Sequence, residues 1–253
     1  RTLAALERAR EQGVLLVPVT GRPAQGLPQA VLDLPGLRYA VTSNGATIRD
    51  LQEDRFLLEK HLTPAACLAV LARCADFDMI RQVFREGVGY LSQTDYDTLK
   101  ARYAGTAMLA YHLSTRKILP GTVEEFLTQD ERPVEELFFL TDSTDTKARL
   151  RAVLSDLPDI GFADPFPNDL EVIAGGIDKG IGLRFLLDHL GIDASEALAM
   201  GDGGSDLPLL QAAGIGVAMA NATAEVKAAA DYITTSCDED GVAVALEKFV
   251  LHP

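Results

Sequence analysis

The chain has 253 residues, of which 47% are hydrophobic and 24% are charged, a composition typical of a folded protein with one large domain or two moderate ones. Its 37 Asp and Glu residues outnumber its 23 Lys and Arg residues, so the net charge is −14. Because no basic run interrupts this excess, we expect no nucleic-acid partner. The apolar runs are too short to span a bilayer, so we expect no membrane partner, and no feature indicates an obligate protein partner.

The three cysteines are Cys67, Cys74 and Cys237. An odd and low number of cysteines is typical of a reducing compartment, so the sequence predicts a cytoplasmic protein without a disulfide framework. Cys67 and Cys74 stand seven residues apart in a helical pattern, which predicts that they share one buried helix face. No spacing of Cys and His resembles a zinc site.

Helices and apolar strands alternate in the first part of the chain. In chain order we predict a helix over 2–9 closed by Gly13, a strand over 14–19, a helix over 24–32 and a strand over 39–42. The run over 14–19 is continuously apolar, which predicts a strand buried on both faces. This alternation is typical of a parallel sheet.

The pattern changes near His61, where short hairpin-like strands mix with helices. We predict helices over 64–75, 122–129 and 147–154, and strands over 79–84, 88–91, 136–140 and 170–173. Such a mixture is typical of an α+β domain, which we place at 61–174. Its basic side chains are expected to be mostly solvated, with some contacting an anionic substrate; they are Arg81, Arg85, Arg102, Arg116 and Lys117.

The alternation resumes after Gly175-Gly176. We predict helices over 179–190, 205–213, 223–230 and 241–251, and strands over 197–200, 216–219 and 232–234. The predicted fold class is therefore α/β: a doubly wound, Rossmann-like parallel-sheet core formed by residues 1–60 and 175–253, with the α+β domain inserted between these two segments.

The segment Gly201–Asp206 places two acids four residues apart among glycines, directly after a predicted strand. The carboxyl ends of strands in open α/β sheets bind ligands, and carboxylates there suit a hard cation such as Mg²⁺. A simpler interpretation makes Ser205 a helix N-cap with Asp206 in the first turn. That interpretation leaves Asp202 unexplained.

Other polar residues also follow predicted strands, namely Thr20-Gly21 and Asn44-Gly45. If these strands are parallel neighbours of the strand before Asp202, the polar groups share one edge; alone, each is explained as a turn residue.

Lys179 is expected at the first position of a helix capped by Asp178, where a cation opposes the helix dipole. Lys179 is therefore either a tolerated solvated lysine or part of an anion site with the helix amides. A metal, a lysine and a hydroxyl together suit phosphoryl transfer.

Several ordered motifs resemble the haloacid dehalogenase-like superfamily, specifically Cof-type phosphatases with an inserted type IIB cap. The matching segments are Val19-Thr20-Gly21-Arg22-Pro23, Ser43-Asn44-Gly45-Ala46, Asp178-Lys179-Gly180, Gly201–Asp206, Gly216-Val217-Ala218-Met219, 226–232 and 238–242. The resemblance covers nearly the whole chain and implies that the inserted domain is the cap that selects the substrate.

The resemblance implies an enzyme, a phosphatase that hydrolyses small phosphate monoesters, such as sugar or cofactor phosphates, with Mg²⁺ and through a phosphoaspartyl intermediate. The implied partner is therefore a small phosphorylated metabolite. Thr20, Lys179 and Asp206 are the implied catalytic residues. The implied phosphate-binding residues are Thr20, Gly21, Asn44, Lys179 and Ser205, and the implied metal ligands are Asp202 and Asp206.

The nucleophile motif of this family, Asp-x-Asp-Gly-Thr, is absent from the sequence. The helical pattern over 2–9 lacks a start signal, so we expect the motif on a strand upstream of Arg1. Asp-Glu-Asp-Gly-Val at 238–242 resembles it superficially, but no strong strand precedes it. Without the upstream strand the sheet would have two unpaired edges, and the chain should be poorly soluble.

A second departure lies in the fourth motif, where Ser205 stands in place of the usual Asn, and Cys237 also replaces a usual Asn. A serine can still donate a hydrogen bond, but its side chain is shorter. These departures keep alternatives open: an inactive protein of the same fold that binds a ligand or partner, or a phosphomutase.

Overall fold

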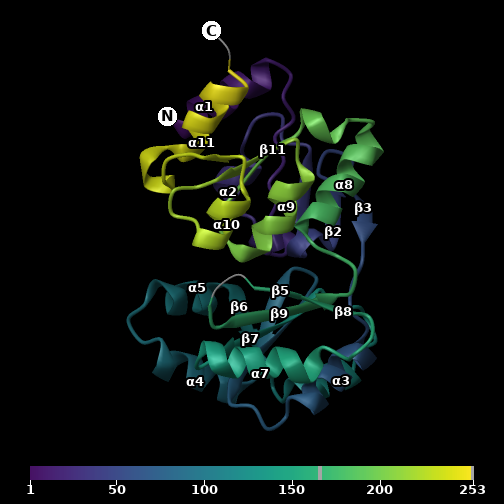
Figure 1. Ribbon diagram of the computed structural model, residues 1–253. Helices are drawn as coiled ribbons and strands as arrows, with labels where there is room; N and C mark the ends of the chain where they lie inside the picture. Colours follow the sequence, from purple (N-terminus) through teal and green to yellow (C-terminus); the bar gives the residue numbers. More distant parts are fainter. Residues whose placement is uncertain (165–166, 252–253) are drawn as a thin grey trace. The chain divides into compact units, whose positions relative to one another are not determined.

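The computed structural model describes residues 1–164 and 167–251. The chain divides into two compact units. Unit 1 comprises Arg1–Gly21, Leu27–Glu59 and Asp178–Pro253, and unit 2 comprises Arg22–Gly26 and Lys60–Ile177 (Figure 1). The inserted domain predicted at 61–174 corresponds to the larger part of unit 2. Throughout the described residues, the helices are too short or too polar to cross a membrane.

One half of unit 1 is a three-stranded parallel sheet. Its strands β10 (Leu198–Gly201), β11 (Ile215–Ala218) and β12 (Tyr232–Ile233) lie in that order. Because the strands are parallel, their carboxyl ends lie at one edge, where loops lead to the next helices. The helices of this half are α8 (Lys179–Leu190), α9 (Leu207–Ala212) and α10 (Ala224–Ala229), with short 3₁₀ helices η3 (Ala194–Glu196) and η4 (Gly204–Asp206).

The other half of unit 1 contains an antiparallel sheet that the sequence pattern did not predict. Its strands are β1 (Tyr39–Thr42), β2 (Thr47–Asp50) and β3 (Arg55–Glu59). The 3₁₀ turn η2 (Ser43–Gly45) reverses the chain between β1 and β2. A reversal of this kind depends on left-handed backbone conformations, which polar turn residues and glycine adopt.

The predicted strand over 14–19 is wrong in two respects. The segment is extended, but it pairs with β1 only at one parallel bridge, between Val19 and Val41. It is also not buried on both faces, because Leu15 is 48% exposed. Strand assignment requires a paired neighbour, and Pro18 has no N–H to donate to a ladder.

Two predicted helices are shorter than expected. The helix over 24–32 is divided into η1 (Ala24–Gly26) and α2 (Gln29–Leu32), because Pro28 interrupts the helical hydrogen bonds. The helix over 205–213 is divided into η4 and α9, and no side chain caps α9. The interpretation of Ser205 as an N-cap is therefore wrong.

The first and last helices of unit 1 lie side by side (Figure 1). They are α1 (Thr2–Glu11) and α11 (Gly241–Phe249), which share a cluster of buried Ala and Leu side chains. Asp240 precedes α11, and its carboxylate accepts hydrogen bonds from the amide and hydroxyl of Thr2. The segment 238–242 therefore spans the end of η5 (Cys237–Glu239) and the start of a helix, unlike the strand and loop that carry the family's nucleophile motif.

Unit 2 is built on a six-stranded sheet in the order β6-β5-β4-β7-β9-β8. The strands are β4 (Met79–Arg85), β5 (Val88–Leu91), β6 (Arg116–Ile118), β7 (Glu136–Thr141), β8 (Ile160–Ala163) and β9 (Asp169–Ala174). The helices are α3 (Pro64–Arg73), α4 (Gln93–Arg102), α5 (Ala107–Thr115), α6 (Val123–Thr128) and α7 (Thr144–Leu154). β4 and β5 form the predicted hairpin, and only the pairing of β5 with β6 is parallel.

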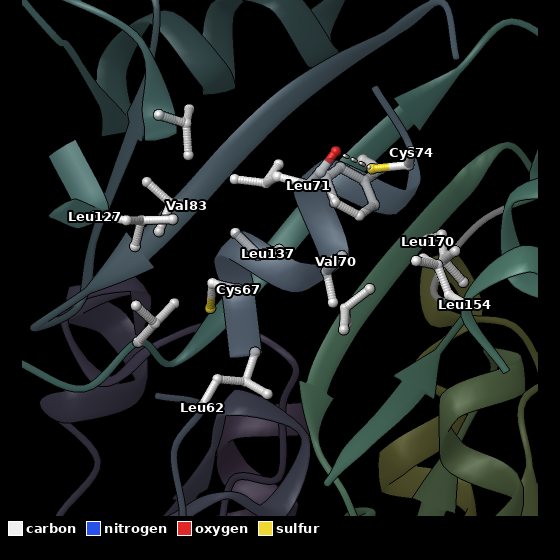
Figure 2. Packing of buried hydrophobic residues seen from close by; sticks show 14 of the residues in the cluster. Leu62, Cys67, Val70, Leu71, Cys74, Val83, Leu127, Leu137, Leu154 and Leu170 are labelled. Atoms are coloured by element: carbon white, nitrogen blue, oxygen red, sulfur yellow. Dashed lines mark hydrogen bonds between the residues drawn. The ribbon is translucent and has the colours of Figure 1, made fainter. Parts of the chain in front are cut away.

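The larger core of unit 2 lies between α3, α6 and α7 and one face of this sheet (Figure 2). Cys67 of α3 and Cys74 at its end are both fully buried, which confirms the prediction that they share a buried face. Burial raises the pKa of the Cys67 thiol to about 12 and that of Cys74 to about 11. Both thiols are therefore packed as small apolar groups.

Three of the five basic residues expected to be mostly solvated are less solvated than predicted, whereas Lys117 is exposed. Arg85 is 2% exposed and forms an ion pair with Asp130. The guanidinium of Arg81 donates to backbone carbonyls, including that of Phe77. Arg116 donates to Gln82 and lies 4.4 Å over the ring of Phe84. The expectation of mostly solvated charges is wrong here, because these guanidinium groups cover the ends and faces of packed elements.

Candidate active site

The turn after β1 brings Thr20, Gly21 and Asn44 together. The amide of Thr20 donates to the carbonyl of Val41 at 3.0 Å, and the amide of Asn44 donates to the carbonyl of Thr20 at 3.1 Å. A Cβ added at Gly21 would lie 3.0 Å from the Asn44 amide oxygen. Glycine at this position therefore lets the Asn44 side chain lie against the backbone.

The same turn is strained and unusually polar for a buried segment. Ser43, Asn44 and Gly45 have φ values of 48°, 53° and 95°. Left-handed conformations at non-glycine residues cost about 1–3 kcal/mol each and cluster at functional sites. The hydroxyl of Ser43 is buried and has no hydrogen-bond partner among the described residues. Strain and unsatisfied polarity at one turn favour a functional role for it.

The turn packs against the start of helix α8. A Cβ added at Gly45 would lie 2.2 Å from the carbonyl oxygen of Asp178, and one at Gly180 would lie 2.2 Å from that of Pro208. The carboxylate of Asp178 accepts a hydrogen bond of 2.7 Å from the amide of Ile181, which confirms its predicted role as N-cap. Two glycines and a cap therefore hold the first turn of α8 in place.

Lys179 is the first residue of α8, as predicted, and it is buried. Its ammonium donates to Asp206 Oδ1 at 2.6 Å and to Ser205 Oγ at 3.0 Å. The interpretation of Lys179 as a solvated lysine is therefore wrong. A buried cation requires a charged partner, and Asp206 supplies one.

Asp206 also organises the loop that carries Asp202. Its second oxygen, Oδ2, accepts hydrogen bonds of 3.0 Å from the amides of both Asp202 and Gly203. Gly201 leaves room for this arrangement, because a Cβ there would lie 2.4 Å from the Cβ of Asp206. Both carboxylate oxygens of Asp206 are thus engaged by the protein. Its predicted role as a second metal ligand stays a prediction.

Asp202 is exposed at the carboxyl end of β10, and one of its oxygens accepts a hydrogen bond of 2.8 Å from Asn221. No cation forms an ion pair with it within residues 1–164 and 167–251, where no group of three His, Cys, Asp or Glu residues could hold a metal. Mg²⁺ in phosphate-processing sites is commonly held by one or two carboxylates together with phosphate oxygens. The single exposed carboxylate of Asp202 therefore fits Mg²⁺ as one of its ligands.

The described contacts connect the predicted residues into two groups. Thr20, Gly21 and Asn44 form one, and Lys179, Ser205, Asp206 and Asp202 form the other. The close approach of Gly45 to Asp178 links the two groups. The sequence reasoning missed Asn221, although a polar residue between a buried strand and a helix was the signal available.

Comparisons with known proteins agree with this geometry. Residues 1–246 match the model of the haloacid dehalogenase-like hydrolase family. A putative phosphatase of Haemophilus influenzae is 27% identical over 98% of this chain and 90% of its own length. The HMP-PP phosphatase of Klebsiella pneumoniae is 31% identical over 90% of this chain and 79% of its own length.

Solved structures show the same similarity. A sugar phosphatase of haloacid dehalogenase subclass IIB is 26% identical and superposes with a TM-score of 0.79, covering 98% of this chain and 90% of that one. These similarities confirm the predicted α/β fold class and the enzyme class, a phosphatase. The chain therefore belongs to the haloacid dehalogenase-like hydrolase family.

Proposed function

We propose that this protein hydrolyses phosphate monoesters of small metabolites with Mg²⁺ and through a phosphoaspartyl intermediate. The observation that carries the proposal is the buried Lys179, whose ammonium donates to Ser205 and Asp206 in the loop that also carries the exposed Asp202. A cation fixed against a loop that also carries a carboxylate suited to Mg²⁺ provides the positive charge that phosphoryl transfer requires.

The phosphate-binding roles follow from the donor groups at the two site segments. The hydroxyl of Thr20 and the amide of Gly21 would donate to the phosphoryl oxygens, and Asn44 would hold this segment through the contacts described above. Lys179 would neutralise charge on the same oxygens. Ser205 would act on the phosphate through Lys179, because its hydroxyl already accepts a hydrogen bond from that ammonium.

Asp202 would ligate Mg²⁺, which when bound supplies positive charge to the transferring phosphoryl group. Asp206 would support the site by holding both Lys179 and the backbone of the Asp202 loop. This arrangement of a ligand and a supporting acid is consistent with the preference of Mg²⁺ for few protein carboxylates.

The proposed nucleophile is an aspartate of an Asp-x-Asp-Gly-Thr motif upstream of Arg1. Its carboxylate would attack phosphorus as the bond to the leaving oxygen breaks, and that oxygen would take a proton from the second aspartate of the motif. Water would then hydrolyse the acyl phosphate. Neither Asp202 nor Asp206 is proposed for this role, because Asp206 is hydrogen-bonded at both oxygens and Asp202 is assigned to the metal.

The proposed substrates are sugar phosphates or phosphorylated cofactors, with the domain over 61–174 selecting among them. The names of similar proteins support these substrate classes. They include the subclass IIB sugar phosphatase, the HMP-PP phosphatase and a 5-amino-6-(5-phospho-D-ribitylamino)uracil phosphatase of Bacillus subtilis, 26% identical over 98% of this chain and 89% of its own length. We further propose a cytoplasmic location, which the three unpaired cysteines support.

The test is an assay of the protein, expressed with the residues encoded upstream of Arg1, against a panel of sugar phosphates and phosphorylated cofactors. We expect release of inorganic phosphate with Mg²⁺, loss of activity with EDTA, and a loss of at least 100-fold in Asp202→Asn. Absence of turnover across the panel would favour the ligand-binding alternative. An isomerised sugar phosphate as the product would identify a phosphomutase instead.

A further inference from the structure

Asn221 connects the loops that follow all three parallel strands of unit 1. It lies in the loop after β11, and its side-chain nitrogen donates to Asp202 Oδ2, after β10, at 2.8 Å. Its side-chain oxygen accepts from the amide of Cys237, after β12, at 3.1 Å. A primary amide can donate to a carboxylate through its nitrogen and accept from a backbone amide through its oxygen.

Backbone hydrogen bonds fix the loop from which this side chain extends. The amide of Met219 donates to the carbonyl of Gly201 at 3.0 Å, and that of Thr223 donates to the carbonyl of Asp202 at 3.4 Å. The amide of Ala220 donates to the carbonyl of Thr235 at 3.2 Å. The orientation of Asn221 is therefore determined on both sides of the residue.

We propose that Asn221 is the positioning residue of the Asp202 carboxylate in the metal site, an inference that rests on the proposed function. Asn221 occupies Oδ2 of Asp202, which would leave Oδ1 to ligate a cation. Hydrogen bonds to ligating carboxylates orient them, and their loss lowers metal affinity by about 10–100-fold.

Removing the Asn221 side chain should change the stability of the protein much less than its metal affinity. Asn221 and Asp202 are both exposed, so the hydrogen bond between them replaces bonds to water. Such bonds make only a small net contribution to the free energy of unfolding. A role in positioning therefore predicts a large change in metal affinity with a small change in stability.

The experiment measures Mn²⁺ binding to the full chain by electron paramagnetic resonance, which reports free Mn²⁺ without requiring turnover. We expect Asn221→Ala to weaken Mn²⁺ binding by about 10–100-fold. Asn221→Gln keeps the amide on a longer side chain and should recover part of the affinity. The matched control is Thr223→Ala, which removes the N-cap of α10 in the same loop but leaves Asp202 and Asn221 intact.

Equal Mn²⁺ affinity in wild type and Asn221→Ala would overturn the inference, and so would an equal loss in Thr223→Ala. If Asp202→Asn abolishes binding while Asn221→Ala binds Mn²⁺ as tightly as wild type, the metal site stands and only the positioning role fails. If wild type binds no Mn²⁺, or Asp202→Asn binds it as well as wild type, both the inference and the proposed metal site are wrong.

Discussion

The ammonium of Lys179 lies 2.6 Å from a carboxylate oxygen of Asp206, in a pair whose side chains are only 8% and 11% exposed. Lys179 stands at the N-terminus of a helix, where a cation costs about 0.3–1 kcal/mol. The pair offsets this penalty and holds the ammonium at one place beside the Asp202 loop. An unfavourable helix position is thus maintained by a residue 27 positions further along the chain.

Replacing Lys179 with Met should destabilise unit 1. The change leaves the Asp206 carboxylate buried without its cation, which typically lowers the free energy of unfolding by about 3–5 kcal/mol. Urea denaturation measures the effect. Lys227→Met is the control, because Lys227 lies in α10 outside the ion pairs described, and it should change stability by less than about 0.5 kcal/mol. Similar losses in the two variants would contradict a structural role for the pair.

Ser205 should influence activity more than stability. Ser205→Ala removes a hydrogen bond to Lys179 but leaves the ion pair with Asp206, so we expect kcat/KM to fall by about 10-fold, the equivalent of one charge-assisted hydrogen bond. Ser205→Asn introduces the residue usual in the family and should retain activity. Steady-state kinetics with a sugar phosphate that the wild-type enzyme hydrolyses measure kcat/KM of both variants. Full activity in Ser205→Ala would show that Asp206 alone positions the lysine.

Gly45→Ala should disturb the link between the Asn44 turn and helix α8. Its φ is 95°, and the added Cβ would meet the carbonyl oxygen of Asp178 at 2.2 Å. We expect the free energy of unfolding to fall by more than about 3 kcal/mol, because conformational strain and a backbone clash combine. Gly13→Ala separates the two effects, since Gly13 has a φ of 86° with no atom within 4 Å of the added Cβ. Equal melting-temperature shifts in both variants would show that the clash relaxes.

His112 should make unit 2 less stable in acid. Burial lowers its pKa to about 4, with Arg116 contributing in the same direction. Unfolded chains bind a proton at this histidine below about pH 6.5, whereas the folded protein does so only near pH 4, so stability falls as pH decreases between these values. The effect is at most about 3 kcal/mol. His112→Phe should remove it, and unchanged pH dependence in urea titrations of that variant would refute the assignment.

Asp169 should produce the opposite dependence. Burial raises its pKa to about 6, above its ordinary value of 3.8, although Lys147 opposes the shift. The folded state therefore keeps this proton to higher pH than the unfolded state, and stability falls as pH rises from about 4 to 6. Asp169→Asn should remove this pH dependence. Relative to wild type, the free energy of unfolding of the variant should therefore be higher at pH 7 than at pH 4. If the variant is less stable than wild type at pH 7, the carboxylate has a favourable partner there.

Local patterns predicted the elements that depend on nearby residues. The helix starting at Lys179 was predicted because Asp178 caps it and Gly191 ends it, and both act within one turn. The buried face containing Cys67 and Cys74 follows from helical periodicity alone. By contrast, the segment over 14–19 had the composition of a buried strand but little pairing, because pairing depends on distant segments.

The sequence by itself determined which residue types were available for chemistry and on which strand or helix ends they stand: Thr20, Asn44, Lys179 and Asp202. Only the tertiary structure decided what those residues contact. It paired Lys179 with Asp206 and Ser205, and it placed Asn221 on Asp202. The physical reason is that caps and periodicity act over a few residues, whereas hydrogen bonds and ion pairs form wherever the folded backbone brings compatible groups within about 3 Å.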